Sequence, residues 1–380
     1  MAKKHSVVTG VESCLTQAHR MERLNEPHPP QVRALFEKGN QVGEAARQQL
    51  GVGQYIGYMR TPIAALLTTE ALTSGASMVY EGTVVDSYGQ AARLDAMEVM
   101  GQNPVSITNR EVKSAGKKKN KDIIDAAVST KRARDAGLGV PETMLMLVNK
   151  DNRLGNTEPA LSEVNITDEV EEVIVSNIID HAEGVIDSST EPAPVLKKSC
   201  RQNPMSGGGR CRFYEQCHGT TAHPVIEYQR LTIDQYQLFH DNGWTDVMDV
   251  PDEHLKPKQL MYKQSLMDGR VVNVRRLTAS LAGIPAGPVH HLDFETSTLA
   301  VPMIPDARPW EQVPEQFSMH LEGDELEHVQ YLSPLDGQDN RRRVAEQLVQ
   351  AVGPEGPIIV WGISMEGPVI RKLATLFPDL

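Results

Sequence analysis

The chain has 380 residues, of which 40% are hydrophobic and 23% charged, and its formal net charge is −12 at pH 7. That length ordinarily holds two or more domains with ordinary cores, and the acidic balance argues against unspecific nucleic-acid binding over the whole surface. No apolar run is long enough to cross a membrane, and the basic start lacks the apolar block of a secretory signal. We therefore expect a cytoplasmic protein without a membrane partner, whose cysteines serve metals or redox chemistry rather than disulfides.

In the first 150 residues, helical periodicity gives way to short β-rich runs. The apolar spacing predicts helices over 30–50 and 61–73. Alternation bounded by turns then predicts strands over 77–85, 92–99 and 106–113, followed by a helix over 122–136 and a strand over 144–148. This order of elements indicates an α/β domain.

Farther along, an amphipathic helix is predicted over 167–187, followed by a linker over 188–194 and a flexible glycine-rich insert at 206–209. Residues 228–285 are expected to be mainly helical, and a Pro- and Gly-rich hinge over 283–288 precedes the last part. There the sequence predicts strands over 289–296, 316–321, 328–332 and 357–361 and helices over 341–352 and 368–376.

Acidic residues and a lysine lie on the predicted strands where metal chemistry requires them. Asp95 is at a strand centre, and Glu111 and Lys113 are two residues apart on the next strand, so the latter pair shares one face. Carboxylates bind hard cations such as Mg²⁺ or Mn²⁺, and an ammonium stabilises charge on an attacked phosphate or orients the water. Glu81, one strand earlier, is a candidate for a further ligand.

A basic stretch follows this group: residues 110–134 hold nine Lys or Arg against three acids. One interpretation is a solvated loop and helix face, the usual fate of such runs. The other is phosphate binding, because the stretch directly follows the Glu-Val-Lys tripeptide. On the second interpretation the DNA backbone is contacted by Lys117, Lys118, Lys119 and Lys121.

An Asp on one strand, Glu-x-Lys on the next and a basic helix after a short loop resemble the core of PD-(D/E)xK nucleases, particularly the RecB-like branch. The resemblance implies that Asp95 and Glu111 bind the metal, that Lys113 stabilises the transition state, and that DNA, single-stranded DNA included, is the partner. Two features common in that family are missing. Ser129 stands where many members carry Gln, and residues 39–43 contain no His.

The chain has four cysteines, one near the start and three close together much later. Any single cysteine can be an ordinary buried thiol, whereas several thiolates together hold zinc or an iron–sulfur cluster. The closely spaced pairs typical of zinc sites are missing. The arrangement resembles the iron–sulfur nucleases of the AddB and CRISPR-adaptation type, which implies a structural [4Fe–4S] cluster held by Cys14, Cys200, Cys211 and Cys217.

Near the C-terminus, Asp293 and Glu295 are two apart on a predicted strand and therefore share a face. This Asp-x-Glu resembles the opening motif of DnaQ-like 3′–5′ exonucleases, which have an RNase-H-like fold and bind two metals through four acids. The element order fits the first half of that fold, with Glu366 as a further acid. Members continue beyond the Phe-Pro that here precedes Leu380, so we expect a truncated gene or a separate chain that completes the fold.

Nearly the whole chain resembles an uncharacterised bacterial family that joins both kinds of domain. The last 95 residues carry the most specific motifs, among them Leu292–Thr296 and residues 371–378. We accordingly expect a restriction-endonuclease-like nuclease domain with an iron–sulfur staple over 1–220, a helical connector over 221–285 and a partial RNase-H-like domain over 286–380. Two alternatives stay open. One is a catalytically silent DNA-binding or assembly scaffold, and the other is a zinc-stapled protein without nuclease function.

Overall fold

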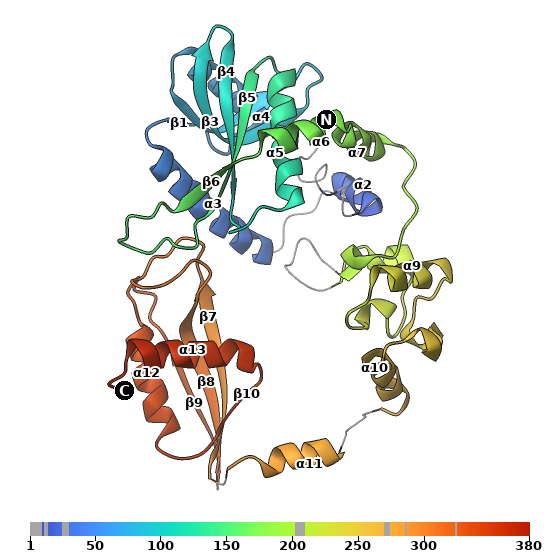
Figure 1. The fold of residues 1–380 in the computed structure, drawn as a ribbon, viewed down its shortest axis with the longest axis vertical. Coiled ribbons are helices and arrows are strands. Elements are labelled where there is room, and N and C mark those ends of the chain that lie inside the picture. Colours follow the sequence, from blue (N-terminus) through green and yellow to red (C-terminus); the bar gives the residue numbers. More distant parts are fainter. Residues whose placement is uncertain are drawn as a thin grey trace. The chain divides into compact units, whose positions relative to one another are not determined.

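The computed structural model describes residues 10, 14–24, 30–201, 210–269, 274–285, 287–323 and 325–380. The chain divides into two compact units, one of residues 1–148 and 160–271 and the other of residues 149–159 and 272–380. Both contain helices and a mixed sheet, so the predicted α/β class is confirmed (Figure 1). The predicted insert at 206–209 lies outside the described residues. Within those ranges, no helix combines the length and the apolar character needed to span a membrane.

The first unit is built on a six-stranded sheet whose strands follow one another in chain order. These are β1 (Gln54–Tyr55), β2 (Met78–Val85), β3 (Ala91–Gln102), β4 (Val105–Lys113), β5 (Gly139–Val148) and β6 (Leu161–Asn165). Strands β2, β3 and β4 form an antiparallel meander, whereas β5 lies parallel to β4. A parallel neighbour needs a crossover, and the helix α5 (Asn120–Asp135) supplies it.

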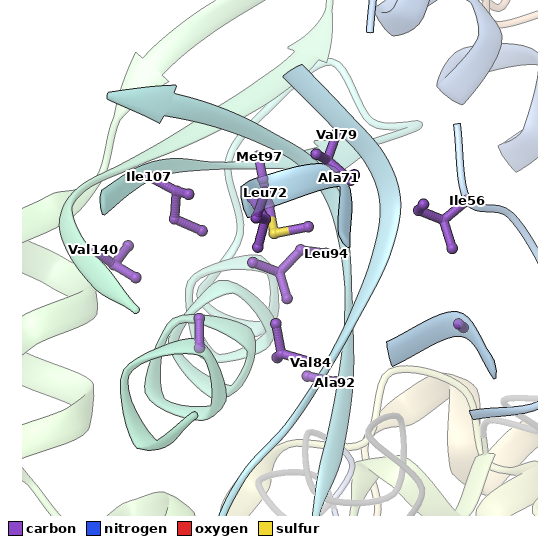
Figure 2. Close-up of a cluster of buried hydrophobic side chains, with 12 residues drawn as sticks. Ile56, Ala71, Leu72, Val79, Val84, Ala92, Leu94, Met97, Ile107 and Val140 are labelled. Atoms are coloured by element: carbon purple, nitrogen blue, oxygen red, sulfur yellow. The ribbon is translucent and has the colours of Figure 1, made fainter. Parts of the chain in front are cut away.

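A buried apolar cluster joins this sheet to α4 (Thr61–Thr73) and to the C-terminal end of α5 (Figure 2). The predicted helix over 61–73 is thus confirmed, as is the helix α3 (Pro30–Leu50). Burial of these side chains provides the main stabilisation of the meander, since removing apolar area from water is worth about 25 cal/mol per Å². The cluster consists of Ile56, Ala64, Ala71, Leu72, Val79, Val84, Ala92, Leu94, Met97, Ile107, Ala133 and Val140.

A second core lies between α5 and three further helices, α2 (Leu15–Arg23), α6 (Thr167–Val175) and α7 (Ile178–Asp187). The prediction of one helix over 167–187 is wrong. Asn177 has a left-handed backbone (φ 57°) that separates α6 from α7, and Asn is one of the few residues that adopt it readily. Apolar residues of both helices still pack in the same core, which is why their pattern resembles one continuous helix.

The last part of the first unit is a small helical segment around its own aromatic core. Its elements are η1 (Lys198–Arg201), α8 (Tyr214–His218), η2 (Val225–Glu227), α9 (Ile233–Asp241), η3 (Val247–Asp249), η4 (Asp252–His254) and α10 (Pro257–Met267). Tyr228 and Phe239 are fully buried there, and Cys200 belongs to the same cluster. The predicted helical character of this segment is therefore confirmed.

The second unit contains α11 (Val274–Ala282) and a four-stranded sheet in the order β10-β7-β8-β9. The strands are β7 (Val289–Thr298), β8 (Gln312–Glu322), β9 (Leu326–Leu332) and β10 (Ile358–Val360), with β10 parallel to β7 and the other pairs antiparallel. The helices α12 (Arg341–Val352) and α13 (Ile363–Leu376) cover one face. The prediction that the last helix starts at Pro368 is wrong, because α13 already begins at Ile363 and contains that proline.

The other face of this sheet carries solvent-exposed side chains. Along β7, Leu292 and Phe294 are buried against the helices, while His291, Asp293 and Glu295 alternate with them and are exposed. Strand β9 is exposed almost throughout its length.

Candidate active site

A cavity of about 400 Å³ lies in the first unit, between α3, the segment after β1 and the meander β2–β4. Three of the four residues predicted from sequence to be catalytic line it: Glu81, Asp95 and Lys113. They come from three neighbouring strands. The other lining residues are Phe36, Gly39, Asn40, Val42, Gly43, Arg47, Tyr55, Tyr58, Val112 and Ser114.

The carboxylate of Asp95 is buried and repelled by a neighbouring acid. Burial, followed by the charge of Glu111, raises its pKa well above the ordinary range, although Lys113 and a backbone hydrogen bond oppose the shift. In that bond the Val112 N–H donates to Asp95 Oδ2 over 2.7 Å. Buried carboxylates with raised pKa are poorly compensated, so a divalent cation would be a favourable neighbour for this group.

Lys113 lies among the acids. Its Nζ donates to Glu111 Oε1 over 2.6 Å and also to Asp125 on α5. Burial disfavours the ammonium, but the charges of Glu111, Asp125 and Asp95 outweigh it and raise the pKa of Lys113. The lysine therefore stays protonated at neutral pH and supplies a fixed positive charge beside the carboxylates.

Glu81 reaches the cavity through an irregularity of the strand. It has φ 54° in the middle of β2, a left-handed conformation that is rare for residues other than glycine. Residues an odd number apart normally face opposite sides of a sheet. Yet Val79 and Val84 belong to one core, as do Leu94 and Met97 on β3. The alternation is therefore broken between them, at the level of Glu81 and Asp95, and both acids are turned away from the apolar core.

Helix α5 adds two polar residues to the site, Ser129 and Asp125. From the sequence, no role was assigned to either. The Ser129 hydroxyl, at the position where the resembling family has Gln, is 3.3 Å from Glu111 Oε2 and donates to it. Asp125, one turn earlier, contacts Lys113. The sequence does show that Asp125 and Ser129 are four residues apart and therefore share one face of a helix. This spacing points to the site only once α5 is known to pack behind β4.

Two arginine–tyrosine pairs, also unpredicted, stand at the cavity. The guanidinium of Arg47 lies 4.7 Å from the ring centre of Tyr55, and that of Arg93 lies 4.0 Å from the ring centre of Tyr58. Tyr55 is 49% exposed and Tyr58 70% exposed. Exposed rings with adjacent cations can stack on nucleic-acid bases and contact phosphates.

The four lysines predicted to contact DNA are exposed and do not belong to the residues that line the cavity. Lys117 and Lys118 precede α5, Lys119 is its N-cap, and Lys121 lies in its first turn. Lys118 forms an ion pair with Glu169. Positive charge at a helix N-terminus is unfavourable for the helix, so helix stability does not explain their position.

A second, smaller cavity of the first unit is lined by all four cysteines. Cys14 is the N-cap of α2, Cys200 is in η1, Cys211 precedes α8, and Cys217 is within α8. His218 also lines this cavity. Residue 14 and residues 200–217, which are far apart in the sequence, thus line one cavity.

Burial makes three of these thiols, Cys200, Cys211 and Cys217, weaker acids. It raises the pKa of Cys200 to about 11 and also raises the pKa of Cys211 and Cys217. Burial, with a contribution from His240, lowers the pKa of His218 to about 4, so this imidazole is neutral at physiological pH. Deprotonated sulfurs here would need a cationic partner, as metal-bound thiolates have.

In the described part of the chain, no three or more His, Cys, Asp or Glu side chains are arranged so that they could hold a metal ion. This finding covers the four cysteines as well as the acids of the active-site cavity. In the latter, the acids already have a positively charged neighbour. The Lys113 ammonium is hydrogen-bonded to Glu111 and Asp125 and takes the position of a counter-charge between them. A cation bound by Glu111 would therefore compete with the Lys113 ammonium for that carboxylate.

The acids predicted in the second unit are not brought together. Asp293 and Glu295 are exposed on the open face of β7. Glu366 is buried in the first turn of α13, only 3% exposed, and its Oε2 has no hydrogen-bond partner within the described residues. No described contact joins Glu366 to either of the other two.

Comparison with known protein families assigns a family to the last part of the chain. The profile of a family described as "Domain of unknown function (DUF2779)" matches residues 290–380, the sheet and helices of the second unit. No curated protein matches the chain. This similarity covers less than half of the chain and assigns no activity to it.

Proposed function

We propose that the chain is a metal-dependent nuclease that hydrolyses phosphodiester bonds of DNA, with its active site in the first unit. The observation that carries this proposal is the grouping of Glu81, Asp95 and Lys113 around one cavity, with Glu111 bonded to the lysine. The meander β2–β4, followed by a crossover helix and a parallel β5, supports a restriction-endonuclease-like arrangement of this unit.

The donor set fits a hard cation. Asp95 and Glu111 would hold Mg²⁺ or Mn²⁺, with Glu81 as a further oxygen ligand. Such an ion supplies Lewis-acid polarisation of the phosphate and lowers the pKa of a water molecule. Lys113, protonated among the acids, would stabilise the negative charge that builds up on the phosphate.

The rest of the cavity fits a nucleic-acid strand. The exposed rings of Tyr55 and Tyr58 would stack on bases, and Arg47 and Arg93 would contact the backbone. The exposed lysines before and within the first turn of α5 would add phosphate contacts outside the cavity. An acidic protein with a local basic approach would bind DNA through this face only.

The four cysteines fit a [4Fe–4S] cluster with a structural role. Cys14, Cys200, Cys211 and Cys217 line one cavity, and sulfur is the donor that iron–sulfur clusters require. The cluster would cross-link α2 to the helical segment around α8. Such a link restricts the unfolded chain most when the closed loop is long.

For the second unit we propose a partial RNase-H-like sheet. Its support is the strand order, an antiparallel β7-β8-β9 meander with β10 parallel to β7. Asp293 and Glu295 would be its metal-binding pair. The proposed partner of this unit is a separate chain that completes the fold. This unit would contribute binding rather than the principal cleavage site, because Glu366 is buried without a described link to the pair.

The test compares Asp95→Asn and Glu111→Gln with the wild type, purified anaerobically and assayed on single- and double-stranded DNA with Mg²⁺ or Mn²⁺. Both variants should lose about 100-fold or more in rate, because several kcal/mol of charge stabilisation disappear. Glu98→Gln, on the same strand as Asp95 but paired with Arg110, is the matched control and should remain active.

Cleavage by Asp95→Asn at the wild-type rate would place the active site elsewhere. Wild-type protein that binds DNA without cutting it would identify the scaffold alternative. The cluster is tested separately by colour. A [4Fe–4S] protein is brown with broad visible absorbance that dithionite bleaches, whereas a colourless, zinc-containing protein would favour the zinc-stapled alternative.

A further inference from the structure

We propose that Gln17 and Arg20 of α2 are positioning residues that hydrogen-bond to cysteine sulfurs and raise the reduction potential of the iron–sulfur cluster. The inference rests on the cofactor proposed above. Gln17 Nε2 lies 3.5 Å from Cys211 Sγ, and Arg20 Nη1 lies 3.3 Å from Cys217 Sγ. Both are donors, so the sulfurs accept.

These contacts follow from the spacing of residues on α2. Cys14, Gln17 and Arg20 are three apart, and residues three apart on a helix lie on one face. Cys14 itself accepts a hydrogen bond at Sγ from the Gln17 backbone N–H over 3.5 Å. The helix therefore delivers one sulfur ligand and two further donors to the same cavity.

Arg20 is held in place by groups other than sulfur. Its guanidinium forms an ion pair with Glu191 over 2.6 Å and donates to Gln216 Oε1 over 3.2 Å. It lies 5.7 Å from the ring centre of Phe213, and its side chain is only 15% exposed. A cation restrained on several sides keeps its position whichever charge the sulfurs carry.

The direction of the effect follows from electrostatics. Reduction adds one electron to a cluster and makes it more negative, so N–H donors and a cation at the sulfurs stabilise the reduced form more than the oxidised one. Hydrogen bonds to the sulfurs and local charge are among the recognised determinants of cluster potential. Removing either donor should therefore make the cluster harder to reduce.

The test is a potentiometric titration of anaerobically prepared protein, followed by visible absorbance and electron paramagnetic resonance, with iron content measured in parallel. Arg20→Gln should bind iron and show a lower potential than the wild type. Gln17→Leu, which keeps the net charge and removes one neutral donor, should shift the potential in the same direction by less.

Arg23→Gln is the matched control. Arg23 lies on the same helix but donates to the carbonyl oxygens of His19 and Ser188, and to no cysteine sulfur in the described contacts. The cluster of the Arg23→Gln variant should have the same reduction potential as that of the wild type. Equal potentials in wild type, Arg20→Gln and Gln17→Leu, all with iron bound, would overturn this inference alone. Wild-type protein without an iron–sulfur cluster would overturn the proposed cofactor as well.

Discussion

At the scale of single residues, the unusual backbone of Glu81 shows how the cavity is made. A non-glycine residue with positive φ inside a strand stores about 1–3 kcal/mol of strain and persists only where its surroundings impose it. The next residue is Gly82, and a Cβ there would lie 2.0 Å from the terminal methyl of Met97. Glu81 itself lines the cavity.

Replacing Tyr58 by alanine should weaken binding of single-stranded DNA by about 1–3 kcal/mol, the usual contribution of one stacked base. Tyr58 is exposed and stacks on Arg93 at the cavity, so its loss removes binding surface without opening a core. Fluorescence anisotropy with a labelled oligonucleotide, in EDTA to prevent cleavage, measures the change.

Tyr88→Ala is the control for this measurement. Tyr88 is 83% exposed in the turn between β2 and β3 and is not part of the cavity wall. Its variant should bind as the wild type does. If both substitutions weakened DNA binding equally, the loss would not depend on the place of Tyr58 at the cavity. Stacking of a base on Tyr58 would then be contradicted.

The sequence was sufficient to predict which site residues lie together when those residues are close along the chain. Glu111 and Lys113 are two apart on one strand, so their shared face followed from strand geometry alone. The pairing of Arg93 with Tyr58 could not be predicted, because it joins a strand to a loop without any periodic relation. Asp125 was missed for the same reason, since its contact with Lys113 depends on how α5 crosses the sheet.

At the scale of elements, α5 is fixed to its surroundings by a buried ion-pair group. Arg132 donates to Asp86 over 2.7 Å and also to Glu183, and the side chains of Arg132 and Asp86 are 6% and 0% exposed. Asp86 follows β2, whereas Glu183 belongs to α7. One arginine therefore connects the meander, the crossover helix and α7.

Arg132→Met should destabilise the first unit by about 3–5 kcal/mol, because it leaves the buried carboxylate of Asp86 and the half-buried one of Glu183 without their counter-charge. The adjacent Lys131→Met should cost only about 0.3–0.5 kcal/mol, since Lys131 pairs with Asp135 on the helix surface. Urea denaturation followed by circular dichroism compares the two midpoints. Similar midpoints would mean that the buried group contributes no more than a surface pair.

The bounds of elements were predicted closely where apolar residues repeat with a regular period and the ends of the element are marked in the sequence. Elements that lack these features were missed. The helices α4 and α12 have the predicted bounds, 61–73 and 341–352. Strand β6 (Leu161–Asn165) was not predicted, because five residues with little burial carry almost no pattern. The break at Asn177 was missed because tertiary packing keeps apolar residues on both sides of it in one core.

At the scale of the whole molecule, the cysteine cavity joins the start of the chain to residues near 200. Cys14→Ser should lower both the iron content and the thermal midpoint of the protein, because the link between α2 and the segment around α8 disappears. Ser199→Ala, which removes a hydroxyl from the same cavity, is the control and should retain iron. An unchanged midpoint in iron-free Cys14→Ser would argue against a structural role for the cluster.

The sequence predicted a nuclease domain over 1–220, a helical connector over 221–285 and a last domain over 286–380. The chain divides into two compact units, 1–148 with 160–271 and 149–159 with 272–380. The sequence did not indicate which acids of the second unit lie on the same face of the sheet as Asp293. Asp293 and Glu295 share a face by strand alternation, as expected, but the burial of Glu366 depends on where α13 begins. That start was predicted too late, so the orientation of the glutamate could not be inferred.

The grip of Glu111 and Asp125 on the Lys113 ammonium has one more implication for how such a centre would be switched on. If Asp95 and Glu111 held a divalent ion, that ion and the Lys113 ammonium would compete for the Glu111 carboxylate. Released from Glu111, Lys113 would remain an ammonium and could pair with a phosphate in the cavity, so the ion and the lysine would act as two linked positive charges.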